Sequence, residues 1–399
     1  MQNLIEYIRE SLIEEGGASG HLAHIIDYTD LTLDNLKGII YSLFNSRIED
    51  VTEKLDGMNI QASMNNAGEV VFIRNKSDLN SERGGMSVAD MAAKWSSKPL
   101  IQSTFVRAGE ILERIFKQVG REFFNPDSET RIFANCECMQ EGITNVIPYK
   151  SAMVNIHDLW IYKKTATGWE YESTTKRGLD KLEKHLDSES QLTPQVLIKT
   201  TEEGTAKMNS YFKTLNKMFK DLGLKNKSTL EEYQYLRFIE YVKQHYNWIS
   251  EDDYGMFFDR LIKGVKSVNL REIKKRYPDH DLTSLDKDKD LKVYPNQELD
   301  KLMISLGNDV IKQCSGFLNS GFEEESIAVL KSDLEATVHQ IEQSDNEPLK
   351  TKLMVNLNRL GSNTVNATEG IVFRYKGRLM KLTGSFACVN QIIGLKYNL

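Results

Sequence analysis

The chain has 399 residues, and its 51 lysines and arginines are balanced by 57 aspartates and glutamates, which gives a formal net charge of −6. With 40% hydrophobic residues, this is the composition of a soluble globular protein of two or three domains, and the acidic balance argues against a protein coated with nucleic acid. No stretch is apolar enough for a signal peptide or a membrane span, so we expect no membrane partner. Four cysteines are too few for a disulfide framework, which predicts a reduced, cytoplasmic protein.

Two helices are predicted within the first 48 residues, because apolar side chains recur there at spacings of three and four. These side chains are Leu4, Ile8 and Leu12 in the first helix and Leu36, Ile39, Ile40 and Leu43 in the second. Between the two lies GGASGHLAHIIDYTDLT, whose glycines predict a loop that carries His21 and His24.

Strands are predicted from about residue 51 to 172. Residues 58–63 and 69–74 flank MNNAG, whose asparagines and glycine suit a hairpin turn. Residues 131–139 and 155–164 form two further predicted strands. This part of the chain therefore predicts a sheet.

Residues 180–360 are predicted to be helical almost throughout. An amphipathic stripe follows Met208, Tyr211, Leu215, Met218 and Leu222, and Ser228-Thr-Leu-Glu231 is predicted as the capping box of the next helix. Further helices are predicted near 253–267, 296–318, 323–343 and 347–360, and strands return in GIVFRYKGRLMKLTG at 370–384.

The order of these segments predicts an α+β fold with antiparallel sheets, in which a β-rich core is interrupted by a long inserted all-helical domain. The predicted boundaries are 1–49 for an N-terminal helical region, 50–178 for the first part of the core, 179–365 for the helical insertion and 366–399 for the final part of the core.

Lys54 lies in VTEKLDGMN, residues 51–59, where a predicted strand runs into a tight turn through Gly57. A lysine amine attacks the α-phosphorus of a nucleoside triphosphate only when it is unprotonated, which requires neighbouring positive charges and partial burial. Such a site also needs a carboxylate for a divalent metal and cations for the triphosphate. Residues of these types occur at the other predicted strands.

In this order the motifs resemble those of the covalent nucleotidyltransferase superfamily, which includes ATP-dependent DNA and RNA ligases and mRNA capping enzymes. EKLDGMN is similar to the nucleophile motif around Lys54, and Asn59 makes it closer to the phage RNA-ligase version. EGIVF is similar to the metal-binding glutamate-glycine motif. The remaining matches are FIRNK with Arg74, ANCEC with Glu137, NIHDLWIY with Asp158 and RLMKLTG with Lys381.

This resemblance covers roughly residues 50–172 and 366–399. The stretches GHLAHIIDYTDLT and VTEKLDG together also resemble proteins of large tailed phages. If the chain is phage-encoded, the expected location is the cytoplasm of the host cell.

The resemblance implies a nucleotidyltransferase fold and an ATP-dependent polynucleotide ligase that joins 5′-phosphate and 3′-hydroxyl ends through a lysyl-adenylate, with RNA favoured over DNA. It implies ATP and Mg²⁺ or Mn²⁺ as cofactors, Glu369 as the metal ligand, and Lys54 and Lys381 as catalytic residues. The implied nucleotide-binding residues are Glu53, Asp56, Gly57, Asn59, Arg74, Glu137, Asp158 and Lys376.

Lys376 is included because the final motif of the family usually contains two lysines, two places apart. Here Leu379 and Thr383 occupy the positions two places from Lys381, so Lys376 or Arg378 is the candidate for the second cation.

Two other functions are compatible with the sequence. One is a catalytically impaired, ligase-like protein of a phage that binds nucleic acid or has a structural role, and the other is a capping-type nucleotidyltransferase that uses GTP. Two basic runs are candidate contacts for nucleic-acid ends or nicks, although a solvated helix face explains them equally well. They comprise Arg260, Lys263, Lys266, Arg271, Lys274, Lys275 and Arg276, and Lys207, Lys213, Lys217 and Lys220.

Some conspicuous residues have a simpler interpretation. Cys136 and Cys138 lack a second Cys/His pair at zinc spacing, which predicts buried thiols. His21 and His24 are predicted to pack or to line the nucleotide pocket. Five aromatic residues of the helical segment are predicted to pack in a core rather than to stack on bases, namely Tyr233, Tyr235, Tyr241, Tyr246 and Trp248.

Overall fold

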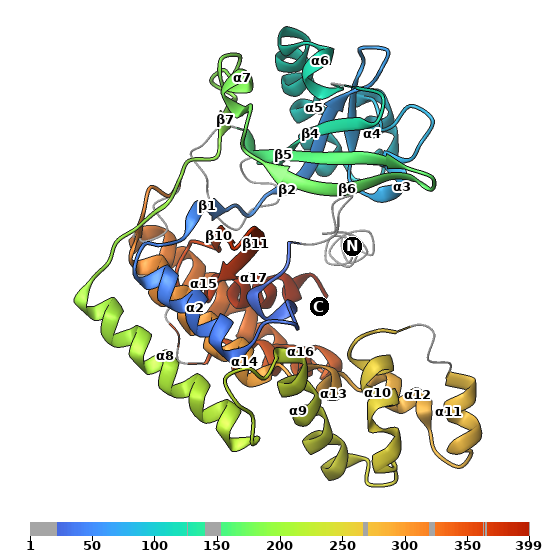
Figure 1. Ribbon diagram of the computed structural model, residues 1–399, viewed down its shortest axis with the longest axis vertical. Coiled ribbons are helices and arrows are strands. Elements are labelled where there is room, and N and C mark those ends of the chain that lie inside the picture. The colour runs from blue at the N-terminus through green and yellow to red at the C-terminus, as the bar shows by residue number, and fades with distance from the viewer. Residues whose placement is uncertain are drawn as a thin grey trace.

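The structure is a computed structural model that describes residues 22–125, 127–139, 153–265, 270–318, 324–361, 363 and 365–398. It has a mixed α and β fold with a six-stranded sheet, a three-stranded sheet and many helices. In Figure 1 the larger sheet lies at the top, the smaller sheet lies in the middle, and most of the helices lie below. No helix in the described ranges is both long and apolar enough to cross a membrane.

The larger sheet has the strand order β3-β2-β4-β5-β6, with antiparallel neighbours throughout, and β7 runs parallel to the start of β5. Its strands are β2 (Met58–Met64), β3 (Val70–Ile73), β4 (Thr130–Cys138), β5 (Val154–Thr165), β6 (Gly168–Thr175) and β7 (Ser190–Leu192). The predicted hairpin between β2 and β3 is confirmed, and Asn65 holds its turn by accepting hydrogen bonds from the backbone of Ala67 and Glu69.

Leu79 of α3 (Lys76–Leu79) packs with Phe133 on one face of the larger sheet, and four helices cover the opposite face. Alternate residues of β2 and β4 pack there against α4 (Val88–Lys94), α5 (Pro99–Val119), α6 (Arg121–Phe124) and α7 (Leu179–Glu183). The prediction of strands across 51–172 was therefore wrong for α3 (Lys76–Leu79) and for α4 to α6. The reason is visible in α5, where Ile101, Phe105, Ala108 and Leu112 recur at helical spacing.

The smaller sheet joins distant parts of the chain, because β1 (Glu49–Lys54) pairs with β10 (Gly370–Tyr375), which pairs with β11 (Arg378–Thr383). One face is buried against α2 (Leu33–Phe44), α8 (Glu202–Asp221) and α14 (Gln297–Lys312) through Ile371, Phe373, Met380 and Leu382. This hydrophobic cluster draws residues from all four of the predicted segments.

The helical part also contains short strands, because β7, β8 (Leu197–Ile198) and β9 (Cys314–Ser315) lie within 179–365, which therefore differs from an all-helical segment. A separate hydrophobic cluster unites α9 (Leu230–His245), α10 (Tyr254–Leu261), α11 (Leu270–Arg276), α12 (Leu282–Lys287) and α13 (Lys289–Val293). The aromatic residues of this region pack in hydrophobic clusters, as predicted. The capping box of α9 lies one residue later than predicted, between Thr229 and Glu232.

The C-terminal helix α17 (Phe386–Gly394) packs with α15 (Glu324–Glu342), α16 (Glu347–Leu360) and α14 in a further cluster. Asn308 of α14 holds the segments before β10 and after β11, since its Oδ1 accepts hydrogen bonds from Asn366 Nδ2 (2.8 Å) and from the backbone of Ser385 (2.9 Å). The helices therefore hold β10 and β11 in place from below (Figure 1).

Candidate functional site

Lys54 and Lys381 project from the same face of the smaller sheet. Lys54 is paired with Gly370, and Val372, two residues further along β10, is paired with Lys381. Because side chains alternate along a strand, residues in rows two apart share a face. This face is opposite the one buried against α2, α8 and α14.

Glu369 lies directly before β10, and its Oε1 is 2.5 Å from the Lys54 Nζ. The two side chains are 14% and 23% exposed, so this ion pair is shielded from bulk water but remains accessible. The antiparallel pairing of β1 with β10 thus brings the predicted nucleophile and the predicted metal ligand into direct contact.

Residues 23–30, called the N-terminal strap below, lie along β11. The backbone N–H of Lys381 donates to Ala23 O (3.0 Å), and Tyr28 Oη donates to Leu379 O (2.6 Å). His24 forms a parallel bridge with Lys381. His24 thus packs beside Lys381, while its place in a nucleotide pocket stays a prediction. His21 lies outside the described residues.

Burial, together with the positive charges of Lys381 and Lys54, lowers the pKa of His24 to about 3. Arg359 of α16 contributes in the same direction. His24 is therefore neutral at ordinary pH.

Glu53 points away from Lys54. Its side chain is 0% exposed, and its Oε2 accepts a hydrogen bond from the backbone N–H of Leu318 (2.7 Å). Burial raises the pKa of Glu53 to about 7, with a smaller contribution from the charge of Glu369. The structure thus places Glu53 on the buried side of β1, away from the face that carries the two lysines.

Replacing Glu53 with glutamine is expected to stabilise the protein at high pH. A carboxyl group with a raised native pKa contributes stability that is fully present below its unfolded value of 4.5 and is lost as the pH rises through about 7. At pH 8 the variant should therefore gain on the order of 2 kcal/mol in unfolding free energy, and at pH 4.5 it should match the wild type. Urea denaturation with EDTA at both pH values measures this, and equal pH dependence of the two proteins would contradict it.

Lys376 and Arg378 lie at the far end of the β10–β11 hairpin. Lys376 (φ 48°) and Gly377 (φ 80°) form its two-residue turn, as the positive φ angles of a type I′ turn require. Lys376 is six residues from Gly370 along β10, which is roughly 20 Å. Arg378 is instead engaged by Asp30, with contacts of 2.8 and 2.7 Å. The structure brings neither residue to Lys54.

The turn after Lys54 rests on the face of the larger sheet that carries Asn135, Glu137 and Asp158, called the polar face below. A Cβ on Gly57 would lie 2.7 Å from Glu137 Cγ and 2.8 Å from Cys138 O, so only glycine fits there without movement. Asp56, half-buried, lies in the same turn. Asn59, two residues after Gly57, is paired with Glu137 and donates through Nδ2 to Asn135 Oδ1 (2.8 Å).

Asp158 is buried on this polar face. It accepts a hydrogen bond from Trp160 Nε1 (2.9 Å). Burial raises the pKa of its carboxyl group, although the charge of His157 and a hydrogen bond from Asn135 act to lower it. Arg74 lies elsewhere, because its guanidinium group is over the ring of Phe105 on the α5 side of the sheet, 5.1 Å from the ring centroid. Cys136 and Cys138 are buried on that same side as free thiols, as predicted.

Three residues that sequence reasoning missed complete this region. Arg374 of β10 donates to Thr174 of β6 and to Gly377 O, and thereby links the open face of the smaller sheet to the larger sheet. His157 lies beside Glu137, and Thr193 lies beside His157. Although His157 lies within NIHDLWIY, the motif matches do not indicate the contacts of these residues, which depend on which strands become neighbours.

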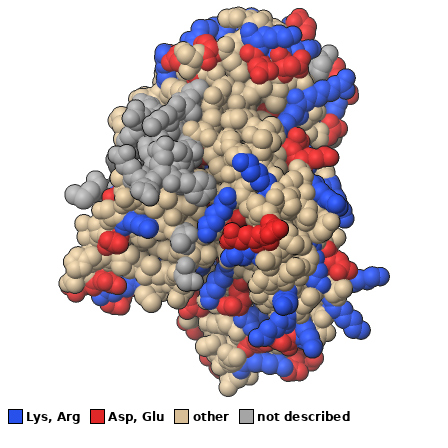
Figure 2. Space-filling view, turned by 90° about the vertical axis from the view of Figure 1, so that its left-hand side faces the viewer, with Lys and Arg blue, Asp and Glu red and all other residues tan. Residues whose placement is uncertain are grey.

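Three residues of the two basic runs form ion pairs. Lys263 lies 2.9 Å from Glu231 and 3.1 Å from Asp259, Lys207 lies 3.3 Å from Asp309, and Arg276 contacts Asp253. Lys266 lies outside the described residues, as does the side chain of Arg271. On the face shown in Figure 2, basic and acidic side chains are interspersed. For these three residues the contacts are those of a solvated helix face, and nucleic-acid binding by the two runs stays a prediction.

The described part of the chain contains no group of three or more His, Cys, Asp or Glu residues that could hold a metal ion. A magnesium ion that accompanies a nucleotide needs only one or two protein carboxylates, because phosphate oxygens and water complete its coordination. Glu369, accessible beside Lys54, fits such a role. Comparisons of the chain with protein-family models, curated proteins and solved structures return no match.

Proposed function

We propose that the chain is a covalent nucleotidyltransferase with the corresponding fold, acting as an ATP-dependent polynucleotide ligase with RNA favoured over DNA. One observation carries the proposal: Lys54 and Glu369 come from motifs at opposite ends of the chain and form a 2.5 Å ion pair. Lys381, from the final motif, lies on the same face of the smaller sheet as Lys54. The order of the motifs led us to expect these residues to meet. A chance resemblance would give no reason for them to meet.

The residues have distinct tasks in the first step. The unprotonated Lys54 amine attacks the α-phosphorus of ATP, an N–P bond forms, and the bond to pyrophosphate breaks while the amine loses a proton. Lys381 stabilises the negative charge that develops on the α-phosphate. Glu369 would hold a divalent ion that reduces the charge of the triphosphate.

Lys54 has to leave its ion pair before it can react. A carboxylate at 2.5 Å favours the ammonium form of lysine, which is not a nucleophile. Lys381, on the same face of the sheet, is a positive charge that acts in the opposite direction. Nucleotide binding that draws Glu369 away from Lys54 would therefore activate the amine.

The later steps pass AMP to an acceptor. The adenylate is transferred to the 5′-phosphate of a nucleic-acid strand, and a 3′-hydroxyl group then attacks this activated phosphate and releases AMP, which seals the break. The acceptor is assigned by the resemblance alone, so the first step is the one to test first.

Labelling of Lys54 tests the proposal. Purified protein is incubated with Mg²⁺ and with ATP or GTP that carries a label on the α-phosphate, after pyrophosphate has removed any bound nucleotide. We expect a labelled band with ATP on a denaturing gel, its loss in Lys54→Ala, and its retention in Lys184→Ala, which alters an exposed lysine after α7. A band with GTP alone would favour a capping-type enzyme, and a folded protein without any label would refute both activities.

A further inference from the structure

We infer that one face of α8, together with the loop after it, binds the phosphate backbone of double-stranded nucleic acid. This surface, called the α8 lysine face below, consists of Lys213, Lys217, Lys220, Lys225 and Lys227. It lies in the helical segment, to which the motif resemblance does not extend. The binding surface is argued from α8 itself, and only its use for the acceptor strand rests on the proposed function.

This part of the chain has a local charge opposite to that of the whole. Residues 204–230 carry six lysines and one acidic residue, Asp221, whereas the complete chain has a formal net charge of −6. Of the six, Lys207 lies 3.3 Å from Asp309, and the other five make up the α8 lysine face. A cluster of basic residues on one face is the electrostatic footprint of a surface that binds a polyanion.

Helical periodicity places three of these lysines in one row. Lys213, Lys217 and Lys220 are spaced by four and then three residues, which makes their side chains neighbours on the helix. All three are exposed, on the side of α8 opposite its buried residues, which include Tyr211, Leu215 and Phe219. Like charges at this spacing repel one another, so the row is stabilised when a polyanion neutralises it.

The loop after α8 carries the other two lysines. Asn226 ties this loop to α2, because its backbone O accepts from the N–H of Asp34 (3.1 Å) and its Oδ1 accepts from Lys37 Nζ (3.4 Å). Lys225 and Lys227, on either side of Asn226, are exposed. The five lysines therefore project from a helix and a loop that are both held in place.

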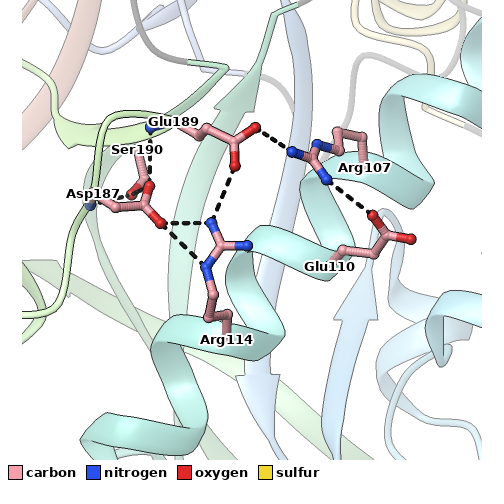
Figure 3. Close-up of polar contacts among 6 residues, drawn as sticks. All are labelled: Arg107, Glu110, Arg114, Asp187, Glu189 and Ser190. Carbon is pink, nitrogen blue, oxygen red and sulfur yellow. Dashed lines mark hydrogen bonds and ion pairs between the residues drawn. The ribbon is translucent and has the colours of Figure 1, made fainter.

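Two arginines of α5 show how surface cations are neutralised within the chain. Arg114 Nη2 lies 2.5 Å from Asp187 Oδ2 and 3.2 Å from Glu189 Oε2, and Arg107 contacts Glu189 as well (Figure 3). Their charges are matched by carboxylates of the segment before β7. In the part of the chain that the structure describes, no carboxylate forms an ion pair with a residue of the α8 lysine face. Its charge is therefore left for a partner outside the chain.

The α8 lysine face lacks the side chains that bind unpaired bases. Proteins that hold single strands stack the bases on aromatic side chains. Between residues 202 and 227, all of which the structure describes, no large hydrophobic side chain is exposed, and Tyr211 and Phe219 are buried. A duplex keeps its bases inside and presents its phosphates on the outside, so a row of lysines on a helix fits a duplex and reads no sequence.

Fluorescence anisotropy without ATP, at several KCl concentrations, tests this inference with short DNA and RNA duplexes of one sequence and with one of their single strands. A triple variant carries Lys213→Ala, Lys217→Ala and Lys220→Ala, which suit a helix. We expect its duplex binding to be at least about a hundredfold weaker at about 0.1 M KCl, and the slope of log K against log salt to be shallower by about 2.7. Arginine at the same three positions should retain the wild-type affinity and slope.

A control variant of the same net charge carries Lys184→Ala, Lys289→Ala and Lys331→Ala, which alter exposed lysines elsewhere. It should bind the duplexes as the wild type does. Equal affinity and slope in the α8 triple variant and the wild type would overturn the inference, as would a wild-type protein that binds no duplex. A single strand that binds as tightly as the duplexes, with the same loss in the triple variant, would overturn the assignment to a duplex.

The outcome of this assay is separate from that of the labelling experiment, because no ATP is present. If Lys54 is labelled but duplex binding does not depend on the three lysines of α8, only this inference fails. If duplex binding depends on them but Lys54 is never labelled, the binding surface stands and the proposed function fails.

Discussion

Replacing Glu369 with glutamine is expected to lower the rate of lysyl-adenylate formation about a hundredfold or more. Glutamine nearly preserves the size of the side chain but removes the negative charge that lies 2.5 Å from the Lys54 Nζ in the free protein. Glu369 is an accessible carboxylate in contact with Lys54 that fits a metal ion. The triphosphate would therefore keep more of its repulsive charge in the transition state.

Rates of label transfer from α-labelled ATP at several Mg²⁺ concentrations measure this effect. Affinity for ATP, measured by calorimetry, should change much less than the rate, because the remaining contacts of the nucleotide persist. Glu347→Gln provides a matched control, since this glutamate is 77% exposed at the start of α16. A Glu369→Gln protein that forms adenylate at the wild-type rate would exclude Glu369 from the reaction.

Local sequence patterns predicted much of the larger sheet. Strand residues alternate in polarity along β2, and the MNNAG turn has the residues that a short hairpin needs, so both could be derived from neighbouring residues alone. Helix α5 could have been found in the same way from Ile101, Phe105 and Ala108, which recur at helical spacing. That error came from applying one period to the whole segment.

The convergence of Lys54 with Glu369 could be expected only from the resemblance, because no local rule pairs β1 with β10. The contacts of His157, Arg374 and the N-terminal strap could not be expected even from the resemblance. A one-residue bulge decides where His157 points, and the packing of two sheets decides what Arg374 meets. These features depend on long-range register, which composition and periodicity do not encode.

Lys376 shows the opposite case, in which a local rule could have corrected the interpretation. The stretch YKGR, residues 375–378, places a lysine and a glycine between two strands, and both adopt positive φ. A two-residue turn at this point separates Lys376 from Gly370 by the whole of β10. Arg359 of α16 contributes to the lowered pKa of His24, but it is itself engaged with Asp300 and Gln391.

Replacing Gly57 with alanine is expected to have an effect of similar size to that of Glu369→Gln, although it changes no charge. The φ angle of Gly57 is outside the left-handed region, so the added methyl group matters through contact alone. It would lie 2.7 Å from Glu137 Cγ and 2.8 Å from Cys138 O. Cys138 belongs to β4, which is paired on both sides, so its backbone cannot yield easily.

The turn that follows Lys54 must therefore lift away from the sheet in Gly57→Ala, and Lys54 moves relative to Glu369. A displacement of about 1 Å at a reacting group costs about a hundredfold in rate, which is the loss we expect in label transfer. Gly255→Ala is the matched control, because it lies in α10 with its nearest neighbour at 3.9 Å and alanine favours a helix. Equal rates in Gly57→Ala and the wild type would show that the turn does not position Lys54, whereas a loss confined to Gly57→Ala would tie the nucleophile to the polar face beneath it.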